Sequence, residues 1–75
     1  MKGFVEVDEK LFKLFIQWYQ DNIHEIKSRI DMFSEKVNFY DEEFLIGYIH
    51  VYYENKYYIE KEKYDILTIC QNEEG

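Results

Sequence analysis

Residues 44–62 read FLIGYIHVYYENKYYIEKE, and this stretch decides the expected fold. β-Branched and aromatic side chains alternate on both sides of one short polar break, which is typical of two antiparallel strands joined by a turn. The pattern predicts strands over 44–53 and 57–62. A third stretch of the same kind predicts a strand over 64–70, although a short terminal helix over 64–71 is an open alternative.

The turn between the first two strands can be chosen by asking which register keeps carboxylates out of the core. A two-residue turn would place Glu60 opposite Val51, among apolar side chains. A three-residue turn instead pairs Val51 with Ile59 and Tyr53 with Tyr57, which gives a consistent inner face. The same register predicts an outer face that carries Tyr48, His50, Tyr52, Tyr58, Glu60 and Glu62.

Residues 8–36 predict one long amphipathic helix. Asp8 can cap its first turn, and apolar residues recur along one side at helical spacing. A break near Asp21 and Asn22 is an alternative, because both are modest helix formers. The expected fold is therefore α+β: one long N-terminal amphipathic helix packed on a three-stranded antiparallel β-meander, in a single small domain over 1–75. Residues 4–7 could add a short strand at an edge of the sheet.

The first half of this helix carries an unusually wide apolar stripe. A domain of 75 residues gains only about 3–5 kcal/mol of stability from its own core, so dimerisation would help it. An ordinary core helix with a few exposed apolar side chains explains the stripe equally well. The homodimer hypothesis assigns the interface to Leu14, Ile16, Trp18 and Ile23.

The negative charge is concentrated in the second half of the chain. The net charge is -7; seven acids face six bases up to residue 40, and nine face three from residue 41 onward. The acidic half also holds six of the eight tyrosines. An acidic, aromatic surface favours a basic protein partner, whereas direct binding to nucleic acid or to anionic membrane is disfavoured.

Catalytic and metal-binding patterns are weak. The candidate nucleophiles and bases fall in no known motif: Ser28, Ser34, Thr68, Cys70, His24 and His50. Three scattered glycines form no phosphate-binding loop, and two histidines with one cysteine match no metal-ligand spacing. The sequence therefore predicts a protein that is not an enzyme and needs no cofactor. The single cysteine and the lack of a signal-peptide pattern predict a cytoplasmic location.

The predicted partner-binding surface combines carboxylates with tyrosines. Same-face residues on a strand lie about 7 Å apart, close to the spacing of phosphates along a nucleic acid strand. Glu60, Glu62 and Asp65 could therefore imitate a short phosphate row. A face that only keeps the protein soluble is an equally good explanation. The full set of predicted contact residues is Asp41, Glu42, Glu43, Tyr52, Tyr58, Glu60, Glu62 and Asp65.

In its small size, its acidity and its richness in lysine, isoleucine, tyrosine and asparagine, the chain resembles small phage-encoded host-takeover proteins. Within this group it is most similar to the acidic DNA mimics, such as the Bacillus phage inhibitor of the nucleoid protein HU. The resemblance implies a non-enzymatic inhibitor that occupies the DNA-binding surface of a basic host protein and competes with DNA. Two alternatives remain: an immunity or antitoxin-like protein that neutralises a basic toxic enzyme, and an adaptor whose helix binds a partner helix.

Overall fold

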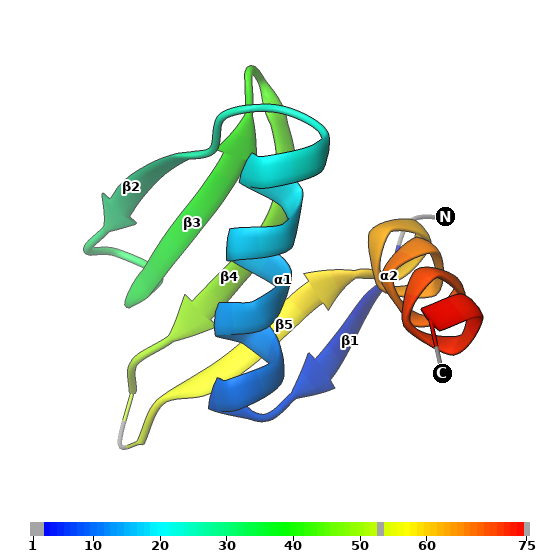
Figure 1. Ribbon diagram of the computed structural model, residues 1–75. Coiled ribbons are helices and arrows are strands. Elements are labelled where there is room, and N and C mark those ends of the chain that lie inside the picture. The colour runs from blue at the N-terminus through cyan, green and yellow to red at the C-terminus, as the bar shows by residue number, and fades with distance from the viewer. Residues whose placement is uncertain (1–2, 53, 75) are drawn as a thin grey trace.

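All strands of the computed structural model belong to one antiparallel sheet, accompanied by two helices (Figure 1). The structure describes residues 3–52 and 54–74, with side chains as far as Cys70. In chain order these residues form β1 (Phe4–Val7), α1 (Glu9–Asn22), β2 (Lys27–Asp31), β3 (Lys36–Asp41), β4 (Phe44–His50), β5 (Lys56–Glu60) and α2 (Lys61–Glu74). The predicted α+β class is confirmed, but the predicted elements are wrong: the sheet has five strands instead of three, and there are two helices instead of one.

The strands follow the order β1-β5-β4-β3-β2 across the sheet. β2 to β5 form a meander, in which each strand pairs with the next, and β1 is added beside β5. Helix α1, which connects β1 to β2, therefore crosses one face of the sheet from one edge to the other (Figure 1). Helix α2 follows β5 directly and contacts β5 and β1.

The single helix predicted over residues 8–36 is wrong beyond Asn22. Its start is as expected, because Asp8 caps α1 by accepting a hydrogen bond from the Leu11 N–H at 2.7 Å. Helix α1 ends at Asn22, at the break that was considered as an alternative. Residues 27–41 then form the β2–β3 hairpin.

The turn of this hairpin explains why the helix does not continue. Asp31 Oδ1 accepts hydrogen bonds from the backbone N–H groups of Phe33 at 3.1 Å and Ser34 at 3.2 Å. Glu35 takes the left-handed conformation, with φ of 53°. Such side-chain bonds to nearby backbone stabilise turns at the expense of helix. The helical spacing of apolar residues here does not reflect a buried face, since Ile30 is 77% exposed.

The two predicted strands of the 44–62 stretch do pair as antiparallel neighbours, but in another register. Ile49 lies opposite Tyr57 and Gly47 opposite Ile59, so the connection runs from residue 51 to residue 55 instead of 54–56. Because the two registers differ by an even number of residues, the apolar face is unchanged. Ile49, Tyr57 and Ile59 all pack in or against the core. Tyr53, one member of a predicted pair, lies outside the described residues.

The predicted third strand, 64–70, belongs instead to α2, which was the open alternative. Glu60 Oε2 accepts a hydrogen bond from the Glu62 N–H at 3.0 Å and so caps the first turn of the helix. Lys61 Nζ lies 2.6 Å from Asp65 Oδ1, one helical turn later. Leu67 is only 2% exposed, because α2 packs its apolar side against the sheet and α1.

One apolar core joins both helices to the sheet. Helix α1 contributes Phe12, Phe15 and Tyr19, which lie on one side of the helix at spacings of three and four residues. The fully buried apolar set also includes Ile46, Ile59 and Leu67.

Gly47 lies where α1 comes close to the sheet. A Cβ atom at this position would be 2.8 Å from the Tyr58 carbonyl oxygen and 3.4 Å from Cε1 of Phe12. The pairing of β3 with β4 also shifts beside it, between Phe39 and Tyr40. Glycine in a strand marks such a close approach or irregularity, and here it allows the Phe12 ring to reach the strand.

We predict that Gly47→Ala destabilises the fold by about 1–3 kcal/mol, because the added methyl group overlaps backbone that cannot move without disturbing β5. Urea denaturation followed by circular dichroism measures the loss. Gly3→Ala is the matched control, since nothing lies within 4 Å of a Cβ there, and its effect should stay within about 0.5 kcal/mol. Equal stabilities of Gly47→Ala and the wild-type chain would contradict this account of the contact.

Candidate functional site

The antiparallel topology brings acidic residues together at one end of the sheet. β3 ends at Asp41, Glu42 and Glu43 form the turn into β4, β5 ends at Glu60, and Glu62 lies in the first turn of α2. In an antiparallel meander, the last residue of one strand and the first residue of the next lie at the same end of the sheet. These five residues, called the acidic end below, are five of the six carboxylates predicted to contact a partner.

A cleft of about 480 Å³ opens at the acidic end. Three carboxylates line it, from Glu43, Glu60 and Glu62, against a single ammonium group, that of Lys63. The remaining lining is apolar and comes from β1 and β4: Phe4, Phe44, Leu45 and Ile46. Such a cleft can receive a side chain that combines an apolar stem with a positive charge.

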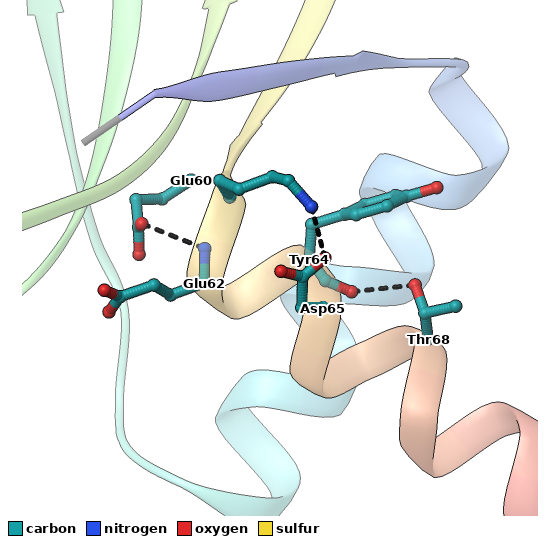
Figure 2. A network of polar contacts seen from close by, with 6 residues as sticks. Glu60, Glu62, Tyr64, Asp65 and Thr68 are labelled. Atoms are coloured by element: carbon teal, nitrogen blue, oxygen red, sulfur yellow. Dashed lines mark hydrogen bonds and ion pairs between the residues drawn. The ribbon is translucent and has the colours of Figure 1, made fainter. Parts of the chain in front are cut away.

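Glu60 is the buried member of the three. It is only 5% exposed, and its Oε2 is bonded to the Glu62 N–H at the junction of β5 and α2. Figure 2 shows the Glu60 and Glu62 side chains on the same side of this junction. Within the described part of the chain Glu60 forms no salt bridge, and its other oxygen accepts no hydrogen bond. A buried carboxylate without a cation is costly, so binding a cation here would be favourable.

Asp41 is committed to the fold. The Tyr19 hydroxyl donates a hydrogen bond to Asp41 Oδ2 at 2.5 Å, and His24 Nδ1 lies 2.8 Å from Asp41 Oδ1. Burial raises the pKa of Tyr19 far above its usual value, and the hydrogen bond to Asp41 and the negative charges of Asp41 and Glu60 raise it further. The phenol therefore stays protonated as a donor. Both oxygens of Asp41 are occupied, which leaves Glu43, Glu60 and Glu62 as the carboxylates of the cleft.

Asp65 is not where the sequence placed it. The predicted third strand would have put Asp65 beside Glu60, with an unfavourable contact between two acids. In the helix, Asp65 pairs with Lys61, and this pair is about half exposed, so it contributes little to stability. The predicted phosphate-like row is therefore wrong: only Glu60 is on a strand, while Glu62 and Asp65 belong to α2.

The predicted mixed face of tyrosines and acids is only partly formed by strands: Tyr48 lies opposite Tyr58, whereas Glu62 belongs to α2. On the face of the sheet away from α1, Tyr58 stacks on Tyr48 with ring centroids 4.7 Å apart. Lys36 Nζ lies 4.5 Å from the centroid of Tyr48, so this face carries cations among its rings. Tyr52 is half exposed in the connection after β4. Phe4, which lines the cleft, packs edge-on against Tyr48 with ring centroids 5.2 Å apart, so this cluster of rings adjoins the acidic end.

The four residues predicted for a dimer interface have different surroundings. Ile16 and Trp18 pack against the core of their own chain, whereas Leu14 and Ile23 are 46% and 47% exposed. Helix α1 thus offers less free apolar surface than the sequence suggested.

Neither helix of the described chain is long and apolar enough to cross a membrane. Among the described residues, no three histidine, cysteine or carboxylate side chains are grouped so that they could hold a metal ion. Chemically, the strongest feature of the site is its concentration of carboxylates beside apolar surface.

Sequence reasoning missed the apolar half of the cleft. Phe44 is 65% exposed although it begins a strand, and it directly follows the acidic run Asp41 to Glu43. The signal available in the sequence for this part of the site was an aromatic residue directly after an acidic run. Phe4 gave no such signal, because only the pairing of β1 with β5 brings it to the cleft.

We predict that Tyr19→Phe lowers the free energy of unfolding by about 1–2 kcal/mol near neutral pH, because the bond to Asp41 is lost. The folded pKa of Tyr19 lies above its unfolded value of about 10. Its stabilising contribution is therefore fully present below about pH 10 and is lost as the pH rises above it. Above about pH 10, the difference in free energy of unfolding between the wild-type chain and Tyr19→Phe should narrow by up to about 1.4 kcal/mol per pH unit.

Urea denaturation from about pH 8 to about pH 11 tests this prediction. Tyr48→Phe is the comparison variant, because burial also raises the pKa of Tyr48, but to a smaller extent. It should change the alkaline slope less than Tyr19→Phe does. Parallel curves for the wild-type chain and Tyr19→Phe over the whole range would refute the inferred role of the Tyr19 proton.

Comparison of the chain with protein-family models, with curated proteins and with solved structures finds no match. The site residues above are accordingly assigned from their geometry and chemistry.

Proposed function

We propose that the chain is a non-enzymatic inhibitor whose acidic end binds the nucleic-acid-binding surface of a basic host protein, such as a nucleoid protein, in competition with DNA. The observation that carries the proposal is the cleft that Glu43, Glu60 and Glu62 line together with apolar side chains and one lysine. Its buried carboxylate, Glu60, lacks a cationic partner within the described chain.

A lysine or arginine side chain of the partner fits this cleft. Its aliphatic stem would lie against Phe44 and Leu45, and its charged end would reach the carboxylates. Arginine is favoured, because its fork of donors can satisfy two carboxylates at once. A surface that binds DNA presents several such side chains, so the neighbouring Glu42 offers a further contact at the acidic end.

Charge, and not strand spacing, would drive the competition with DNA. A net charge of -7 attracts a basic protein at long range and speeds encounter. The proposal places the protein in the cytoplasm, where a DNA-binding partner would meet it. No serine, threonine or cysteine lines the described cleft, which supports a binding role over hydrolysis by a nucleophile.

We predict that Glu43→Lys/Glu62→Lys weakens binding to the basic partner by at least about tenfold without unfolding the domain. The matched control is Glu35→Lys/Glu54→Lys, which changes the net charge equally at the opposite end of the sheet, in the β2–β3 turn and the β4–β5 connection. Glu60 is left unchanged, because it caps α2.

The measurement uses the immobilised chain in bacterial lysate, elution with rising salt, and excess duplex DNA as competitor. The wild-type chain and the control should retain a basic protein that DNA displaces, and the Glu43/Glu62 variant should lose it. A partner that withstands high salt and ignores DNA would overturn the proposal, because screening weakens contacts between exposed charges. Equal loss in both double variants would show that net charge alone, and not the cleft, determines binding.

A further inference from the structure

The outer edge of β2 is an open interaction surface. β2 is the last strand of the sheet and pairs only with β3, so one side of its backbone has no strand partner (Figure 1). β3 is the only described element with which β2 makes extensive contact. Free N–H and C=O groups on such an edge can pair with another strand.

The side chains around this edge are unusually apolar for an exposed hairpin. Ile30 is 77% exposed, Met32 is 84% exposed and Phe33 is fully exposed. Helix α1, which covers the central strands, leaves this corner uncovered. Burying these side chains against another chain would remove an apolar patch from water.

Charge selects the register in which two copies of β2 could pair. A twofold axis between antiparallel strands must pass through a pair of equivalent residues, and opposed side chains share a face. If the twofold axis passes through Ser28, Lys27 of one copy lies opposite Arg29 of the other. If it passes through Arg29 or Asp31, that residue lies opposite the same residue of the other copy, so like charges again meet. A centre at Ile30 pairs each Arg29 with Asp31 of the other copy and places the two Ile30 side chains together.

The two charged residues are available for this pairing. Neither Arg29 nor Asp31 forms a salt bridge within the described chain. The Arg29 guanidinium is held 5.7 Å from the centroid of Tyr40, on the same strand pair. Hydrogen bonds from Ser34, and a weaker one from Phe33, hold the pKa of Asp31 below its usual value, so the carboxylate is ionised.

We propose that the chain forms a symmetric homodimer by antiparallel pairing of β2 with β2 of a second copy, centred on Ile30. The result is one continuous sheet across both copies. This interface replaces the predicted helical one, where Ile16 and Trp18 are already packed in their own core. The inference is independent of the proposed function, since no partner is needed to observe it.

Two charge-reversal variants test the register, with mass measured by sedimentation equilibrium and by native mass spectrometry. In Arg29→Asp, acids oppose acids, and in Asp31→Arg, arginines oppose arginines; each variant alone should bind itself at least about tenfold more weakly than the wild-type chain does. Mixed together, the two should form a heterodimer, because every opposed pair is then of opposite charge. Circular dichroism checks that each variant is folded.

Two further variants keep the test decisive. Lys27→Asp makes the same charge change as Arg29→Asp, but in this register Lys27 faces position 33, which lies in the turn beyond the end of β2 and carries no charge, so dimerisation should be unchanged. Asp31→Asn retains an oxygen for the turn bonds and should still weaken the dimer, which separates charge from folding. A wild-type chain that stays monomeric at its highest soluble concentration overturns the proposal. So does a Lys27→Asp variant as impaired as Arg29→Asp, or a dimer that only Leu14→Asp or Ile23→Asp abolishes.

Discussion

The buried carboxylate of Glu60 is the constraint on which the arrangement of this protein depends. It ends β5 and caps α2, so the chain changes from strand to helix at this residue. Because the chain becomes helical here, Leu67 lies in the core, and Glu62 lines the cleft together with Glu43 of the β3–β4 turn. The same carboxylate lines the cleft and forms no salt bridge among the described residues. One group therefore links the architecture to the proposed chemistry of the site, because burying a carboxylate without a cation is costly and a bound cation would offset that cost.

Charged and aromatic surfaces adjoin in this fold. The carboxylates gather at one end of the sheet, and Phe4 of the cleft contacts Tyr48, which stacks on Tyr58 with Lys36 nearby. At the acidic end, the hydrogen bond from Tyr19 to Asp41 joins helix α1 to the end of strand β3. Asp41 therefore accepts a hydrogen bond within the fold. One of the carboxylates clustered at the acidic end is in this way satisfied by the protein itself. A partner that binds the carboxylates at the end of the sheet would therefore also meet aromatic surface beside them.

The prediction from sequence succeeded where the determining contacts are local. Asp8 was identified as the cap of α1, and the alternating residues of 44–62 were assigned to strands with the correct inner face. It failed at residues 27–36, where helical spacing of apolar side chains was read as a buried stripe that the structure leaves exposed. It failed again at 64–70, because alternation over so few residues does not distinguish a strand from a helix. Three of the carboxylates predicted to contact a partner, Glu43, Glu60 and Glu62, line one cleft, whereas Phe4, which also lines it, was missed, since only the pairing of β1 with β5 brings it there.

The amino-acid sequence by itself determined the acidic balance of the second half, the start of α1 and the apolar faces of β4 and β5. These properties depend on composition, on hydrogen bonds between near neighbours and on short periodicity, all of which can be read along the chain. The tertiary structure decided where α1 ends, that β1 pairs with β5, that 64–70 is helical, and which carboxylates share a cleft. Those outcomes depend on contacts between residues far apart in sequence, whose packing free energies override the small local preferences of each segment.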